Sequence, residues 1–276
     1  MPAHALRAII TRPGQDADAW AAQIQRNGIA AVALPMIDIV AVTDRSALIK
    51  SWKDMATYDA LMFVSSNAVS HFFAARPAGV VNLWGAQGAN APRAWVTGPG
   101  SRAALLAQGV QAARIDMPAP MAQSLDSEAL WLQVQSQIKA GTRILIVRGD
   151  KASEAADGLA AAGATGQGRD WLAVQLQERG AQVNYVVAYA RKPPQWTAAQ
   201  RDIVAQSLLG KDVWVWSSAE ALGNLLGAFP GQSWAGAKAV ATHARIAQAA
   251  RLAGFGKVAL ARPGLAALCA SIESLA

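Results

Sequence analysis

The chain repeats part of its own sequence, and the repeat unit is as large as a domain. Residues 18–28 recur 152 residues later as residues 170–180, and residues 61–66 recur at the same spacing as residues 213–218. The units of solenoid proteins are much shorter, at roughly 20–50 residues. The repeat therefore predicts two similar domains, with a ligand cleft between them.

The composition indicates compact globular domains. Hydrophobic residues make up 53% of the chain and charged residues only 16%, which argues against disorder. A transmembrane helix needs roughly 20 consecutive apolar residues, and no such run occurs. The N-terminus has no secretory signal pattern. We therefore expect a cytoplasmic protein that does not bind a membrane.

The net charge of +7 indicates an anionic ligand. The basic residues are scattered and do not alternate with aromatic residues, so we expect no nucleic-acid partner. Cys269 is the only cysteine, which rules out a disulfide and a cysteine-based metal site. The three histidines show no ligand spacing. We expect neither a metal nor a cofactor.

Short apolar segments alternate with amphipathic helical patterns along the whole chain. This alternation predicts an α/β fold with doubly wound parallel sheets that carry helices on both faces. Residues 157–168, rich in Ala and Gly, are predicted to be an insertion. Residues 29–42, interrupted by Pro35, are predicted to be extended, and residues 127–139 are predicted to form a helix. The predicted strands lie near residues 7–13, 59–67, 93–101, 112–118, 143–149, 182–192, 212–218, 238–245 and 257–263.

Small polar, basic or glycine residues follow the predicted strands. In open parallel sheets the ligand binds at the carboxyl ends of the strands. Hydroxyls and backbone N–H groups at helix N-termini bind anions, and arginine binds carboxylates through two hydrogen bonds. Helix capping alone is the alternative role for these hydroxyls. The predicted substrate-binding residues are Arg12, Ser65, Ser66, Thr97, Gly98, Ser101, Arg148, Gly149, Ser217, Ser218, Thr242 and His243.

Tyr189 is the predicted catalytic residue. It ends an apolar run, and a phenol can donate a proton or a hydrogen bond at neutral pH without carrying charge. The alternative is a sheet tyrosine whose hydroxyl lies in water. His71 is expected to be a surface or packing residue. The sequence contains no Gly-x-Gly-x-x-Gly, no Walker A loop and no nucleophile elbow, which argues against dinucleotide, nucleotide-hydrolase and serine-hydrolase chemistry.

Several motifs follow one another along the chain. They are Ile-Thr-Arg-Pro at 10–13, Val-Ser-Ser-Asn-Ala-Val at 64–69, Val-Thr-Gly-Pro-Gly-Ser at 96–101, Val-Arg-Gly at 147–149, Val-Ala-Tyr at 187–189 and Val-Ala-Thr-His-Ala-Arg-Ile-Ala at 240–247. In this order they resemble uroporphyrinogen-III synthases, and the resemblance spans nearly the whole chain. Tyr189 lies at the family's tyrosine. Ser65 stands where the family often has threonine, and Thr242 with His243 replaces a more usual Gly-Pro-Thr turn.

The resemblance implies two α/β domains joined by a two-stranded connection. The first domain comprises residues 1–37 and 190–276, and the second comprises residues 38–189. The implied reaction closes the linear tetrapyrrole hydroxymethylbilane to uroporphyrinogen III, with loss of water and inversion of ring D, and needs no cofactor. Tyr189 is implied to assist the departure of the hydroxyl. The polycarboxylate substrate is the implied partner, and we expect a monomer.

Two other functions remain open at this point. The same two lobes could form a non-catalytic anion-binding or sensor module. A transferase acting on a phosphorylated sugar is a further alternative, but the sequence has neither an Asp-x-Asp metal site nor a phosphate loop.

Overall fold

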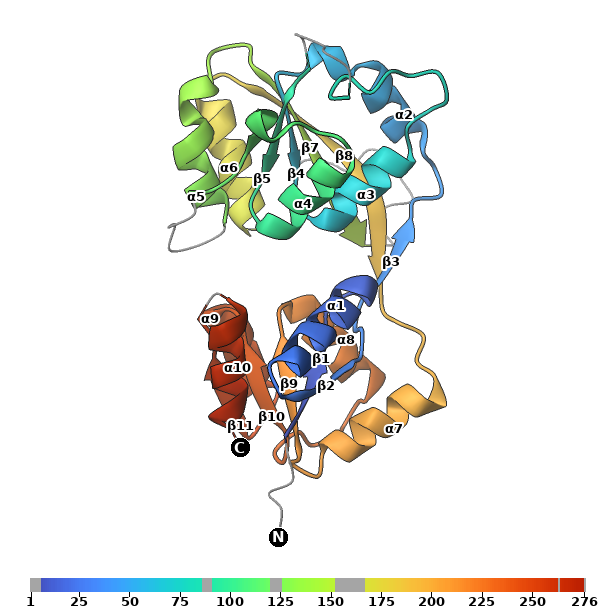
Figure 1. The fold of residues 1–276 in the computed structure, drawn as a ribbon, viewed down its shortest axis with the longest axis vertical. Helices are drawn as coiled ribbons and strands as arrows, with labels where there is room; N and C mark the ends of the chain where they lie inside the picture. The colour runs from blue at the N-terminus through green and yellow to red at the C-terminus, as the bar shows by residue number, and fades with distance from the viewer. Residues whose placement is uncertain (1–5, 86–90, 120–125, 152–166, 263, 276) are drawn as a thin grey trace. The chain divides into compact units, whose positions relative to one another are not determined.

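The chain forms two compact units (Figure 1). The computed structural model describes residues 6–85, 91–119, 126–151, 167–262 and 264–275. Unit 1 consists of Met1–Ile39 and Lys192–Ala276, and unit 2 of Val40–Arg191. The chain therefore crosses between the units twice. Both crossings fall two residues after the predicted boundaries.

Unit 1 is built on a parallel sheet. In the described residues the sheet has five strands in the order β11-β10-β9-β1-β2, and all neighbouring pairs are parallel. The three central strands are almost wholly buried, as is typical of parallel strands covered on both faces, whereas the two edge strands are partly exposed. The strands are β1 (Arg7–Ile10), β2 (Ala30–Ala33), β9 (Asp212–Trp216), β10 (Lys238–Ala241) and β11 (Lys257–Leu260).

Helices cover both faces of this sheet. Helices α1 (Gly14–Arg26) and α10 (Leu265–Glu273) pack on one face. The other face contacts α7, α8 and α9, which span Ala198–Ser207, Ala219–Ala228 and Ala244–Leu252.

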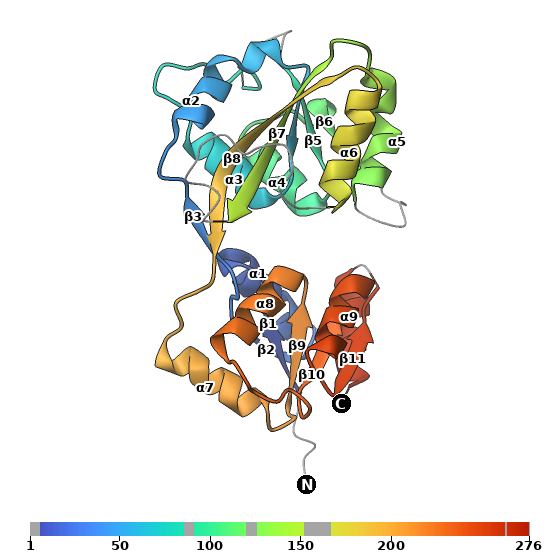
Figure 2. The same ribbon diagram turned by 180° about the vertical axis from the view of Figure 1, so that it is seen from behind.

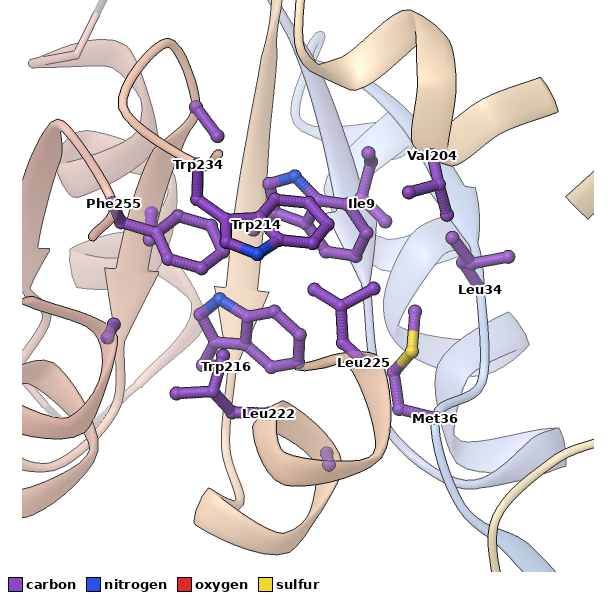
Figure 3. Close-up of a cluster of buried hydrophobic side chains, with 14 of the residues drawn as sticks. Ile9, Leu34, Met36, Val204, Trp214, Trp216, Leu222, Leu225, Trp234 and Phe255 are labelled. Carbon is purple, nitrogen blue, oxygen red and sulfur yellow. The ribbon is translucent and has the colours of Figure 1, made fainter. Parts of the chain in front are cut away.

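Aromatic side chains fill the core between the sheet of unit 1 and helices α7, α8 and α9 (Figure 3). Trp214 and Trp216 alternate along β9 and point to the same face, where their rings stack with a centroid distance of 5.3 Å. Trp234 and Phe255 pack edge-on against Trp214 and stack on each other. The two tryptophans of β9 are therefore core residues, fully buried.

The sheet of unit 2 has the same strand order, with one additional strand at its edge. In the described residues it has six strands in the order β3-β8-β7-β4-β5-β6. Strands β8, β7, β4, β5 and β6 take the places that β2, β1, β9, β10 and β11 take in unit 1. The strands are β3 (Asp38–Ala41), β4 (Ala60–Phe63), β5 (Arg93–Val96), β6 (Ile115–Asp116), β7 (Arg143–Lys151) and β8 (Gln182–Lys192).

Helices also cover both faces of this second sheet. Helices α5 (Ser127–Val134) and α6 (Gln167–Glu178) lie side by side on one face (Figure 2). On the other face, an aromatic cluster joins β4 to α2 (Ser46–Lys53) and α3 (Ser66–Ala74). Helix α4 (Pro99–Ala107) packs beside α3.

Three short 3-10 turns accompany these helices in the described part of unit 2, at Met55–Thr57, Ala112–Arg114 and Gln135–Gln137. The last of them replaces the end of the helix predicted to run to residue 139. Most of the predicted insertion at 157–168 lies outside the described residues.

The sequence repeat and the units do not coincide. Strands β1 and β2 of the first repeat belong to unit 1, whereas β4, β5 and β6 of the same repeat belong to unit 2. The second repeat supplies the complementary parts, β7 and β8 to unit 2 and β9, β10 and β11 to unit 1. Each unit thus combines the first part of one repeat with the last part of the other.

Candidate active site

The candidate site lies in unit 2, at the carboxyl ends of three neighbouring strands. Strands β4, β7 and β8 are adjacent in the sheet. Ser65 follows β4, Gly149 lies in the last part of β7, and Tyr189 lies in the last part of β8. Sheets with this strand order bind ligands where neighbouring strands lead to helices on opposite faces. In unit 2 this position is the pair β4 and β7.

A hydrogen bond connects the two hydroxyl groups of the site. The Tyr189 hydroxyl and Ser65 Oγ are 3.1 Å apart. Ser65 is the N-cap of α3, and its Oγ also accepts a hydrogen bond from the Ala68 N–H at 3.1 Å. The phenol oxygen is therefore held at the positive end of helix α3, which favours negative charge on an oxygen placed there.

Tyr189 is enclosed by its neighbours and is only 4% exposed. Its ring lies directly over Gly149, because a Cβ placed on Gly149 would come within 2.2 Å of Tyr189 Cζ. The His71 ring, on α3, has its centroid 5.7 Å from that of Tyr189. Burial lowers the pKa of His71, so the imidazole beside the phenol is neutral at pH 7.

His71 was predicted to be a surface or packing residue, and in the structure it is partly buried and packs against an aromatic ring. It contacts the ring of the predicted catalytic residue. Nothing in the sequence around His71 signals this, because the contact depends on how α3 packs relative to β8.

The contacts of Arg148 differ from those of Tyr189. The guanidinium is buried, donates from Nη2 to Asp150 Oδ2 at 3.3 Å and lies 5.1 Å from the centroid of the Tyr185 ring. Tyr185 packs against the core cluster under α5 and α6. Asp150, which the sequence analysis did not select, is 3% exposed. The structure thus does not bring the Arg148 guanidinium together with Ser65.

The other predicted residues of unit 2 begin two neighbouring helices. Ser66 is the first residue of α3, next to the capping Ser65. Gly98 is the N-cap of α4, and Thr97 precedes it at the end of β5. Ser101 lies in the first turn of α4 and is buried. Strand β5 is adjacent to β4, so the N-termini of α3 and α4 follow neighbouring strand ends.

In unit 2 the first serine of the pair caps a helix, whereas in unit 1 the second serine does so. The repeat aligns Ser65 with Ser217, but Ser218 is the N-cap of α8 and accepts from the Ala221 N–H at 3.4 Å. The reason is that β9 extends to Trp216, whereas β4 ends at Phe63.

The other predicted residues of unit 1 lie at two further strand ends. Arg12 follows β1, and its guanidinium lies 4.3 Å from the centroid of the Trp20 ring. Desolvation lowers the pKa of Arg12, against the opposing effect of the nearby Asp16 carboxylate. His243 follows Thr242 and is the N-cap of α9, where its Nδ1 accepts from the Arg245 N–H at 3.2 Å.

Capping was the alternative role for these residues, and the structure shows it at Ser65, Ser218 and His243. Capping does not exclude ligand binding, since a capped helix N-terminus still presents further N–H groups. In the described part of the chain, no group of three or more His, Cys, Asp or Glu residues could hold a metal ion. No helix there is both long enough and apolar enough to cross a membrane.

A family model described as uroporphyrinogen-III synthase HemD matches residues 18–270. The chain belongs to the uroporphyrinogen-III synthase family. It is accordingly an enzyme of tetrapyrrole biosynthesis, a cyclising lyase that forms uroporphyrinogen III. The match includes parts of both units and every candidate-site residue except Arg12, which precedes it.

Solved structures of the family share the fold. The Helicobacter pylori uroporphyrinogen-III synthetase is 13% identical and covers 99% of this chain and 100% of its own, with a TM-score of 0.57. A mutant uroporphyrinogen III synthase from Thermus thermophilus is 15% identical and covers 98% of both chains, with a TM-score of 0.54. No curated protein sequence matches the chain.

Proposed function

We propose that Tyr189 donates the proton with which the terminal hydroxyl of hydroxymethylbilane leaves as water. The observation that supports this role is the contact between the Tyr189 hydroxyl and Ser65 Oγ at the N-terminus of α3. Departure of the hydroxyl creates the electrophile that closes the macrocycle. A weak acid held at the leaving oxygen is the group that this step requires.

The surroundings of Tyr189 suit an oxygen that gains negative charge. When the phenol gives up its proton, Ser65 can donate a hydrogen bond to the phenolate. The serine hydroxyl is free to do so because Oγ already accepts from Ala68, which leaves its own proton for Tyr189. The positive end of α3 stabilises the same charge.

Burial of Tyr189 serves the next step of the reaction. The electrophile reacts with water if water reaches it, and an unguided chain closes to the type I isomer. Groups that exclude water and hold the reacting ends in place therefore determine which product forms. A phenol that is 4% exposed meets the substrate in surroundings that exclude most of the solvent.

The substrate carboxylates require anion-binding groups. We propose that the strand-end residues supply them, through hydroxyls and backbone N–H groups at helix N-termini. The desolvated guanidinium of Arg12 is a further candidate, since the negative charge of an anion would offset part of the cost of its desolvation. The proposed binding residues are Arg12, Ser66, Thr97, Gly98, Ser101, Ser217, Ser218, Thr242 and His243.

We further propose that the protein is cytoplasmic and monomeric, and that it requires no cofactor. Sedimentation equilibrium of the purified protein tests the oligomeric state. A mass of at least twice 28.8 kDa would contradict a monomer.

The decisive experiment generates hydroxymethylbilane enzymatically in the presence of the purified protein. Products are oxidised to porphyrins, and the type I and type III isomers are separated by chromatography. We expect type III product in proportion to the protein added, with no added metal or cofactor. Formation of type I alone, at the rate seen without the protein, would refute the proposal.

A further inference from the structure

We infer that Gly149 and an extra residue in β8, Ala188, form a device that positions the Tyr189 phenol against Ser65. The inference rests on the proposed function of Tyr189. It gives Gly149 a steric role in place of the anion-binding role predicted from the sequence. Gly149 is thus a positioning residue that acts through Tyr189.

Regular alternation along β8 would place Tyr189 on the wrong face of the sheet. Side chains of a strand point alternately to its two faces. Val183 and Tyr185 of β8 pack against the core cluster under α5 and α6, as do Ile144 and Ile146 of β7. Tyr189 is four residues after Tyr185, so an unbroken strand would point it toward α5 and α6 as well.

A shift in the pairing of β7 with β8 changes this direction. Arg148 pairs with Val187, but the next residue, Gly149, pairs with Tyr189. Ala188 is therefore an extra residue, as in a β-bulge, and bulges often redirect a side chain near an active site. Beyond it, Tyr189 shares the face of Gly149, which is the face of α3. The contacts of Tyr189 with Ser65 and His71 follow from this reversal.

The reversal places the phenol ring on top of the neighbouring strand, where only glycine leaves room. A Cβ on Gly149 would lie 2.2 Å from Tyr189 Cζ and 2.3 Å from Cε2. The first of these atoms is the carbon that bears the hydroxyl. Carbon atoms in contact stay about 3.5 Å apart. Any side chain at position 149 must therefore move the hydroxyl end of the ring by more than about 1 Å, away from its place beside Ser65.

The variant Gly149→Ala tests this positioning by spectroscopy, without reference to activity. The chain has three tyrosines, Tyr58, Tyr185 and Tyr189, so protein labelled with fluorotyrosine gives three fluorine resonances. Loss of a resonance in Tyr189→Phe assigns it. We expect Gly149→Ala to move the Tyr189 resonance and to leave that of Tyr58 in place. An unmoved Tyr189 resonance would overturn the inference.

Kinetics then show whether Gly149 acts through Tyr189. A displacement of about 1 Å in a reacting group can cost on the order of 100-fold in rate. We expect Gly149→Ala to lower kcat for type III product by about that factor, and to change it much less in the Tyr189→Phe background. An equal loss in both backgrounds would contradict a role through Tyr189. The control Gly227→Ala, at an exposed position of helix α8 with no atom near its Cβ, should match the wild type.

A folding defect would also be informative. If Gly149→Ala does not fold, Gly149→Ala combined with Tyr189→Ala must fold, because removal of the ring makes room for the Cβ. Failure of both variants to fold would overturn the inference. The proposed function can fail separately: wild-type protein that yields only type I product refutes it, while the fluorine spectra still decide whether Gly149 positions the ring.

Discussion

Ser65 makes two contacts through one oxygen, and the substitution Ser65→Ala removes both. One contact caps α3, and the other holds the Tyr189 hydroxyl. Loss of an N-cap hydroxyl costs about 1 kcal/mol of stability. Thr197 supplies the matched control, because its hydroxyl caps α7 and accepts from the Gln200 N–H in the same way. Thr197→Ala should therefore be destabilised by a similar amount.

The two variants should differ in catalysis. A hydrogen bond to a charged group contributes about 1.5–3 kcal/mol, which corresponds to a factor of about 10 to 150 in rate. If Ser65 stabilises the phenolate of Tyr189, Ser65→Ala lowers kcat for type III product by a factor in this range, whereas Thr197→Ala keeps the wild-type kcat. Ser65→Thr retains the hydroxyl and should restore most of the activity.

Urea denaturation gives the stability of each variant, and the enzyme-coupled isomer assay gives kcat and KM. The reasoning would be refuted if Ser65→Ala and Thr197→Ala turned over at the same rate. It would also be refuted if Ser65→Ala raised KM alone, since the oxygen would then serve substrate binding rather than the phenolate.

Three further predictions concern catalysis by Tyr189, the pH dependence of stability and a buried ion pair. Tyr189→Phe should slow type III formation in the coupled assay and leave the circular dichroism spectrum unchanged; unaltered kinetics would remove Tyr189 from the mechanism. Burial lowers the pKa of His71, so the unfolded chain, with a His pKa near 6.5, takes up the proton first as the pH falls. Wild-type stability should therefore drop below about pH 6.5 more steeply than that of His71→Gln, as urea midpoints measured against pH will show. Arg7→Ala leaves Asp212 buried without its two 2.9 Å hydrogen bonds and should cost about 2 kcal/mol in urea denaturation; a loss near zero would contradict this.

Much of the secondary structure could be predicted from local sequence. Strand β8 spans Gln182–Lys192, the range expected from its apolar run. Pro35 divides the expected extended segment after Gly28 into β2 and β3, since proline cannot take part fully in a strand ladder. These features depend on residues close together in the chain, which is why the sequence reveals them.

Which strands pair could not be read from the repeat. The similarity at a spacing of 152 residues identifies equivalent strands and helices, but it does not say which copies join one sheet. In unit 1, β1 pairs with β9, which is 205 residues away at Arg7 and Asp212. The repeat therefore predicts two similar domains, but it does not predict that each of them combines parts of both repeats.

The contacts within the candidate site could not be predicted from the sequence either. Tyr189 and Ser65 were both selected from the sequence, but their contact spans 124 residues and depends on tertiary packing. A strict alternation of side chains would have placed Tyr189 on the face of Tyr185. The extra residue Ala188 becomes visible only in the pairing of β8 with β7.

The two units differ in the length of the strand pair that carries the candidate site in unit 2. Strands β1 and β2 end at Ile10 and Ala33, whereas their counterparts β7 and β8 continue to Lys151 and Lys192. Gly149 and Tyr189 both lie in this extension. The residue 152 positions before Tyr189 is Ile37, which is buried in the hydrophobic core of unit 1. The two units thus share the order of their equivalent strands. The extension of β7 and β8, with its extra residue and its glycine, places a phenol at a helix N-terminus in unit 2.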